Sequence, residues 1–149
     1  MKKKGILQLV FFAIALLLVS PAIAQNESVV TLSGNAYITS GQTAFIDEDH
    51  SAIRNWNDKE TVISFYFRTT ESGNMNIALQ AKGKSRIEVS LLGKKKKVTL
   101  NSETLSRIEL GTFKIKNPGY VKVDVRGLKI NEGDDFGSIE SVIVGGHVS

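Results

Sequence analysis

The sequence predicts an all-β fold, an antiparallel β-sandwich of about eight strands, and two observations lead to it. From residue 25 onward, no segment keeps the i, i+3, i+4, i+7 spacing of apolar residues that marks an amphipathic helix. Apolar and polar residues alternate instead, in short runs that Gly, Asn, Asp and Pro interrupt about every ten residues. Strands of this kind, each with one apolar face, pack in two layers around a shared core.

The expected strands follow one another along the whole chain after the N-terminal segment. Two short apolar stretches come first. In the third strand, Ile63, Phe65 and Phe67 alternate with more polar residues, as in a strand with one buried face. The turn Glu71–Asn74 then leads into an aliphatic strand. In order, the expected strands span residues 29–32, 43–46, 62–68, 75–81, 87–91, 98–100, 108–115, 120–126 and 138–144.

Turn signals separate the strands of the second half. Leu92–Lys94 is predicted to form a hairpin tip, and Asn117–Gly119 contains the Asn, Pro and Gly of a strong turn. The strand after that turn has the clearest alternation, with Val121, Val123 and Val125 expected to face the core. The polar residues between these valines are expected to face solvent.

The first 24 residues predict export. Lys2–Lys4 form a positive segment, Ile6–Val19 is apolar apart from one glutamine, and Ala22–Ala24 has the small residues of a signal-peptidase site. The apolar run is shorter than the roughly 20 residues that a spanning helix needs. We therefore expect a signal peptide at 1–24, cleavage before Gln25, and a mature chain of residues 25–149 that forms a single sandwich domain. Its expected location is periplasmic or extracellular, with no membrane anchor after cleavage.

Charge and cysteine content narrow the classes of partner. The chain has 19 basic and 15 acidic residues, a net charge of +4, and three of its lysines leave with the signal, so the mature chain carries about +1. A nucleic-acid-binding protein would carry a dense basic surface, so we expect no nucleic acid as a partner. The chain has no cysteine. This absence favours a bacterial exported protein whose core is stable without disulfides, and it excludes lipid attachment at a cysteine.

Several runs of residues resemble known secreted domains. The order of VISFYFRTTESGNMNIALQA, SRIEVSLLGKKKKVTL, IELGTFKIKNPGYVKVDVRG and FGSIESVIVGG resembles that of galactose-binding-like carbohydrate-binding modules. IRNWNDKETVISFYFRT and GYVKVDVRGL are similar to a family of secreted bacterial domains of unknown function, which often precede a larger domain. The resemblance implies a jelly-roll-like sandwich and carbohydrate binding.

Catalytic residues are scarce. The only histidines are His50 and His147, no cysteine is present, and no G-x-S-x-G motif occurs. Asp134 and Asp135 are adjacent in a glycine-flanked turn, whereas a glycosidase needs two carboxyl groups that face each other across a cleft. We therefore expect the protein not to be an enzyme, with a hydrolase as a distant alternative.

Two acidic clusters are weak calcium candidates. Asp47 and Asp49 lie in one, Asp134 and Asp135 in the other, and calcium takes six to eight oxygen ligands. The related modules often hold a structural calcium between acidic residues in the first and last strands, but here only Glu140 is placed for that. Acidic loops are more often simply solvated, so we expect no metal or cofactor, with a structural calcium as the alternative.

Trp56 is the strongest single ligand candidate, in the polar segment 47–60. Sugar-binding sites pair an aromatic ring with amide and guanidinium groups, and Arg54, Asn55 and Asn57 flank this tryptophan. The alternative is a ring that folds back to fill one end of the sandwich. A second candidate set shares outward positions on two strands and forms either a binding face or an ordinary wet surface: Tyr66, Arg68, Tyr120, Asp124 and Arg126.

Lys94–Lys97 is a run of four lysines beside the expected hairpin tip. Such a run favours either a site for acidic polysaccharide or phosphate, or an exposed edge that lysines protect from aggregation. Taken together, the sequence predicts an exported, non-catalytic module that binds carbohydrate or a cell-surface glycan. The alternative is a structural or interaction domain that packs against a partner domain or protein.

Overall fold

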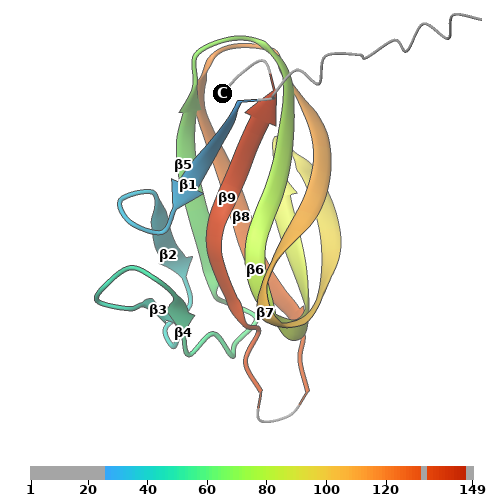
Figure 1. The fold of residues 1–149 in the computed structure, drawn as a ribbon. Coiled ribbons are helices and arrows are strands. Elements are labelled where there is room, and N and C mark those ends of the chain that lie inside the picture. The colour runs from blue at the N-terminus through green and yellow to red at the C-terminus, as the bar shows by residue number, and fades with distance from the viewer. Residues whose placement is uncertain (1–25, 132–133, 147–149) are drawn as a thin grey trace, which may run out of the picture.

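The computed structural model describes residues 26–131 and 134–146, and within these ranges it contains strands, turns and loops (Figure 1). The expected signal, residues 1–24, lies outside the described residues, as does His147. In the described ranges, no helix is long and apolar enough to cross a lipid bilayer. The strands are β1 (Glu27–Thr31), β2 (Ala36–Ser40), β3 (Phe45–Ile46), β4 (Ile53–Arg54), β5 (Val62–Thr69), β6 (Gly73–Leu91), β7 (Lys94–Ile115), β8 (Gly119–Lys129) and β9 (Ser138–Gly146).

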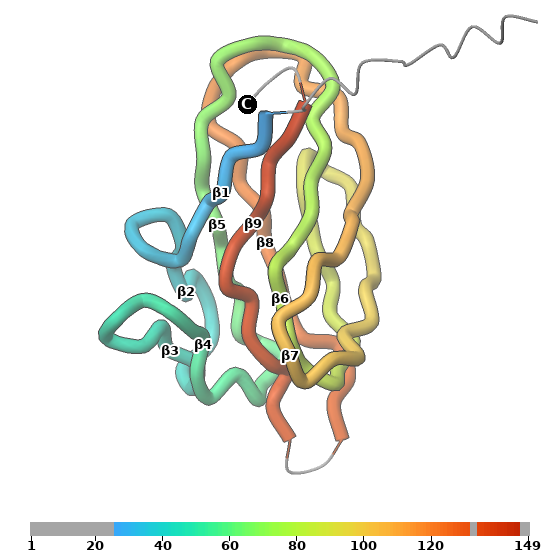
Figure 2. The backbone as a smooth tube through the Cα atoms, viewed as in Figure 1, coloured from blue at the N-terminus to red at the C-terminus, as the bar shows by residue number. Residues whose placement is uncertain are grey.

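The long hairpin of β6 and β7 joins two layers of antiparallel strands (Figure 2). Residues 75–82 of β6 pair with β9, whereas residues 86–91 pair with β8. A bulge between Ala81 and Gly83 lies at this change of partner, which is where a strand bends from one sheet into another. One layer has the order β1-β9-β6-β7 and the other β2-β5-β8-β6-β7. The predicted antiparallel β-sandwich is confirmed.

Four strands differ from the sequence prediction. β6 and β7 are each one long strand where two shorter ones were expected, because Gly83 and Ser102 remain paired across the hairpin. β2 was not predicted. The polar segment 47–60, which contains none of the expected strands, includes β4, which pairs with β3 at the end of the sandwich. The predicted hairpin tip is confirmed as the turn between β6 and β7.

The core lies between the two layers and is formed by the inward side of each strand. In β8, Val121, Val123 and Val125 are buried while Tyr120 and Lys122 are exposed, so the predicted alternation is confirmed. The facing layer contributes aliphatic side chains from β6 and β9. The fully buried members of this core include Ile63, Phe65, Ile77, Leu79, Ile87, Val123, Val125 and Val142.

Trp56 and Phe136 close one end of the sandwich. Their ring centroids are 5.2 Å apart, and the Phe136 backbone N–H donates to the Trp56 carbonyl oxygen at 2.8 Å. Both rings are completely buried. Phe136 occupies the space above Gly127, where an added Cβ would lie 2.2 Å from the ring. The prediction that Trp56 is an exposed stacking platform is therefore wrong, because no face of the ring is accessible, and the end-filling alternative is correct.

Candidate functional site

The outer face of β2, β5 and β8 gathers aromatic and polar side chains. Alternation along β5 and β8 directs one residue in two away from the core. The register then sets Tyr66 opposite Lys122 and Arg68 opposite Tyr120. On the other side of β5, Tyr37 of β2 lies opposite Ser64. Residues far apart in the sequence are thus neighbours on this face.

A hollow of about 730 Å³ lies on this face and is called here the tyrosine hollow. All three tyrosines of the chain line it. Tyr120 is 82% exposed and Tyr37 is 54% exposed, while the rings of Tyr37 and Tyr66 meet edge to face with centroids 6.0 Å apart. The remaining lining comes from Gly34, Asn35, Thr39, Phe67 and Arg68. An exposed ring presents a flat apolar face beside a hydroxyl group, which suits a ligand that is itself apolar on one side and polar at its edges.

Arg68 supplies the cation of the tyrosine hollow. Its side chain is exposed, and it makes no hydrogen bond or ion pair within the described residues. A guanidinium without a protein partner keeps all its N–H donors available for a ligand. Asn35 and Thr39 add amide and hydroxyl groups on the β2 side.

Beneath the hollow, a chain of hydrogen bonds fixes β2, β5 and β8 to one another. The hydroxyls of Thr39 and Ser64 are 2.7 Å apart, and Ser64 donates to Asp124 Oδ1 at 2.6 Å. The second Asp124 oxygen is 2.9 Å from Lys122 Nζ. The hydrogen bond that Lys122 donates to Asp124 raises the pKa of Lys122. Because both of its oxygens are engaged within the sheet, Asp124 supports the hollow and does not line it.

Arg126 lies farther along β8 and is also engaged. Its Nε is 3.2 Å from Oε1 of Glu88, a mostly buried carboxylate that Lys95 approaches at 3.4 Å. Of the five outward residues that the sequence singled out, three therefore line the tyrosine hollow, namely Tyr66, Arg68 and Tyr120.

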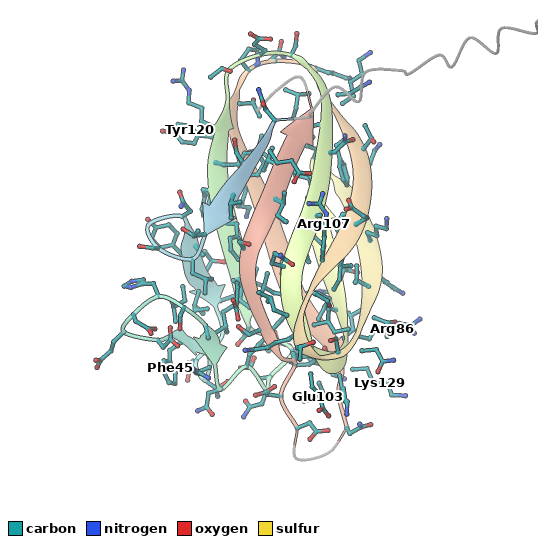
Figure 3. The ribbon with its side chains drawn as sticks, in the orientation of Figure 1. Phe45, Arg86, Glu103, Arg107, Tyr120 and Lys129 are labelled. Atoms are coloured by element: carbon teal, nitrogen blue, oxygen red, sulfur yellow. The ribbon has the colours of Figure 1, made fainter. Side chains whose placement is uncertain are left out.

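The polar neighbours of Trp56 form a separate group. Phe45, which pairs with Arg54, lies near the opposite end of the molecule from Tyr120 (Figure 3). The guanidinium of Arg54 is 3.1 Å from Asp47, and Asn57 accepts a hydrogen bond from Thr43. Asn55 is exposed. With the tryptophan buried, these residues do not flank an accessible indole ring, and they lie far from the tyrosine hollow.

The acidic clusters are tied into turns. Asp47 accepts hydrogen bonds from the backbone N–H groups of Ala52 at 2.9 Å and Ser51 at 2.8 Å. These bonds, that from Ala52 above all, lower the pKa of Asp47 to about 2. Asp49 accepts from Ser51, and Asp135 accepts from Gly137. Asp134 lies in the loop before β9, and Glu140 is 3.4 Å from Lys82. Across residues 26–131 and 134–146, no three metal-ligating side chains come together.

Tyr37 is the functional candidate that the sequence prediction missed. It belongs to β2, whose five residues follow the turn Ser33–Asn35 and alternate as Ala36 in, Tyr37 out, Ile38 in. That alternation is the signal that could have identified both the strand and the ring. Because β2 has only five residues, its alternation does not distinguish it from a loop in the sequence.

Solved structures share this fold. A CBM36-1 domain of a multidomain xylanase, from a termite hindgut metagenome (Trinervitermes trinervoides), has 13% identity and a TM-score of 0.60, covering 83% of this chain and all of that one. A CBM35 from Cellvibrio japonicus has 13% identity and a TM-score of 0.60, covering 81% of this chain and 94% of that one. A Podospora anserina GH26-CBM35 β-(1,4)-mannanase has 10% identity and a TM-score of 0.60 over 83% of this chain, which spans 28% of that protein.

At these identities the likeness shows the fold alone, a sandwich of the carbohydrate-binding-module type. A search of curated proteins found no match. A family model matches residues 30–149, which include every strand after β1 and the last two residues of β1. The predicted membership of a family without assigned function is thereby confirmed: the chain belongs to the family described as domain of unknown function DUF5077.

Proposed function

We propose that this protein is a non-catalytic carbohydrate-binding module whose ligand lies in the tyrosine hollow. The observation that carries the proposal is the gathering of all three tyrosines around one hollow, two of them more than half exposed. Exposed aromatic rings cost solvation free energy unless a ligand covers them, and a sugar ring offers a C–H face that stacks on them. Arg68 and Asn35 supply donors for the hydroxyls at the sugar's edge.

The lining of the hollow also argues against hydrolysis. Glycosidases work with two carboxyl groups across a cleft, and the residues that line this hollow include no carboxylate and no histidine. Asp124, an acidic residue on the outer side of β8, has both oxygens engaged. Binding without bond cleavage is the chemistry that this set of side chains supports.

The fold supports the same proposal independently. The similar structures named above are carbohydrate-binding modules, or an enzyme that carries one. The finer assignments remain part of the proposal: a glycan as ligand, export through residues 1–24, and a location outside the cytoplasm.

A protein partner is the second candidate. Tyr and Arg are also enriched at protein interfaces, and Val29 at the edge strand β1 is 61% exposed. A partner domain that covered the tyrosine hollow would use the same rings. The experiment below separates the two, because only the first proposal requires an isolated glycan to bind.

The test is a glycan array probed with protein expressed from the full sequence, followed by calorimetry with the best ligand. Tyr120→Ala is expected to weaken binding about tenfold, since a stacked ring contributes roughly 1.5 kcal/mol. Phe45→Ala is the matched control, because Phe45 is also an exposed ring, at 51%, but lies outside the hollow. Its affinity is expected to equal that of the wild type. Absence of any bound glycan, or equal losses in the two variants, would contradict the proposal.

A further inference from the structure

A second hollow lies on the same outer face, toward the other end of the sandwich. Its volume is about 400 Å³, and it is called here the basic hollow. Lys129 lies nine positions after Tyr120 along β8, which corresponds to roughly 30 Å of extended strand. Figure 3 shows these two labelled residues near opposite ends of the molecule, with Arg86 beside Lys129. The exposed polar residues that line the basic hollow are Lys84, Arg86, Thr99, Asn101, Lys129 and Asn131, and the buried Ser85 lies among them.

Two cations that line this hollow lie opposite each other on neighbouring strands. Arg86 of β6 and Lys129 of β8 are register partners, and Thr99 of β7 lies on the other side of Arg86. Both cations are exposed, and neither side chain has a hydrogen bond or ion pair within the described residues. Like charges directly opposite each other on neighbouring strands destabilise a sheet. Within residues 26–131 and 134–146, no carboxylate forms an ion pair with either cation, so a bound anion would relieve their repulsion.

Most of the described arginines, unlike Arg86, form an ion pair with a carboxylate. Three of the five described arginines are held by a carboxylate: Arg54, Arg107 and Arg126. The two without one are Arg68 and Arg86, and each lines a hollow on the outer face of β5, β8 and β6. Arg68 lies among aromatic rings, whereas Arg86 lies among charged and amide groups.

We infer that the basic hollow binds one oxyanion, a carboxylate, sulfate or phosphate group, with Arg86 as its main donor and Lys129 as the second charge. The planar guanidinium can donate two parallel N–H bonds to such a group, and the ammonium neutralises the remaining charge. Thr99, Asn101 and Asn131 place hydroxyl and amide groups around the same space.

Neighbouring carboxylates limit the ligand to a small or terminal anion. Lys84 and Asn131 also line an adjoining hollow of about 630 Å³, whose other lining includes Glu103, Asp134 and Asp135. Lys84 stands between the two hollows and is paired with Glu103. A long polyanion that entered the basic hollow would bring further negative charges against these carboxylates, which repel them. A ligand with one oxyanion and uncharged hydroxyls beyond it meets no such repulsion.

The base of the hollow is held in place by the bend of β6. Ser85 is buried, and its hydroxyl donates to the Phe136 carbonyl oxygen at 2.7 Å. Gly83 packs so closely on the next segment that an added Cβ would lie 2.8 Å from that same oxygen. Arg86 therefore projects from a segment that is fixed against the end of the sandwich, which reduces the ordering that ligand binding requires.

The test is a titration of the full-sequence protein followed by backbone amide NMR, with inorganic phosphate, glucose 6-phosphate and glucose as probes. Phosphate and glucose 6-phosphate are expected to shift amides of residues 84–86, 99–101 and 129–131 saturably, and glucose is not. Arg86→Gln is expected to weaken this binding about tenfold, the effect of one lost charge-assisted hydrogen bond. Lys114→Gln, which removes an equally exposed cation from β7 outside the hollow, is expected to change it less than about twofold.

The two phosphate probes distinguish the source of the anion. Tighter binding of glucose 6-phosphate indicates an anionic sugar, and equal binding indicates a free anion, so either result supports the site. No shift at these amides, an equal shift with glucose, or equal losses in Arg86→Gln and Lys114→Gln would overturn the inference. A heparin oligosaccharide that bound more tightly than glucose 6-phosphate would overturn the limit to a single oxyanion. Tyr120→Ala is expected to leave these titrations unchanged, so the outcome is independent of the tyrosine hollow.

Discussion

The protein holds two groups of aromatic residues that differ in exposure. At one end of the sandwich, Trp56 and Phe136 pack against each other and are fully buried. Toward the other end, Tyr37 and Tyr120 stand on the outer face of the sheet with most of their surface in solvent. The polar residues beside each ring in the sequence do not predict this difference in exposure. An aromatic residue in a polar segment can be part of the core, and one on a regular strand can be part of a site.

Trp56→Ala is expected to have the largest effect on stability. Removal of a fully buried ring leaves a cavity, and such changes cost about 3–5 kcal/mol in the free energy of unfolding. Denaturant unfolding measures this directly. Trp56→Phe is the control and is expected to be much milder, because it keeps a ring and removes an indole N–H that has no hydrogen-bond partner. An alanine variant as stable as the wild type would mean that the ring is not part of the core.

Gly127→Ala tests the packing of Phe136 at the same end of the sandwich as Trp56. The added methyl group would lie 2.2 Å from the Phe136 ring, so this ring has to move and with it the contact to Trp56. Overpacking of this kind costs about 1–3 kcal/mol. Thermal unfolding provides the measurement. Gly145→Ala is the reference, because Gly145, like Gly127, has no positive φ and a Cβ there meets only the flexible side chain of Glu27, at 3.3 Å, and the Asn26 carbonyl oxygen at 3.9 Å. Equal effects of the two substitutions would show that the contact with the Phe136 ring costs no stability.

Tyr120→Ala is expected to change stability by less than about 0.5 kcal/mol, because its ring makes little contact with the core. The same substitution is expected to reduce glycan affinity, so this variant separates binding from folding. A large fall in melting temperature would show that the tyrosine hollow is a structural surface. Comparison with Trp56→Ala in one denaturation series makes the contrast between the two aromatic groups quantitative.

The smallest expected effect is the pH dependence from Asp47. Its pKa is lowered to about 2 in the folded protein, against 3.8 as its ordinary value. The carboxylate therefore stabilises the fold fully above about pH 4, and this contribution is lost as the pH falls towards 2. The difference in stability between wild type and Asp47→Asn should be constant at neutral pH and shrink over that acidic window. A difference that did not change with pH would show that the Asp47 hydrogen bonds are not formed.

The parts that sequence predicted well are those with local causes. Alternation in β5 and β8 placed Phe65 and Val123 in the core and Tyr66 and Tyr120 outside, because a strand's faces follow from its own residues. The turn at Gly93 follows equally from local chemistry. The fold class could be predicted from such local signals alone.

The parts that sequence could not predict have distant causes. Trp56 is buried because Phe136, from a loop 80 residues later, packs against it over Gly127. β6 continues through Gly83 because β7 pairs with both of its halves. Tyr37 joins the tyrosine hollow only because β2 pairs with β5. No window of neighbouring residues contains this information.

The proposal that a glycan binds in the tyrosine hollow, and not at Trp56, can be tested by an NMR titration with the glycan that the array selects. Both aromatic groups are observed in this one experiment. Trp56 is the sole tryptophan, so its indole N–H gives a single, assignable signal. We expect the amides of residues 34–39, 66–68 and 119–121 to shift saturably while the indole signal stays in place. A shift of the indole signal, with the amides of the tyrosine hollow unchanged, would contradict the proposal.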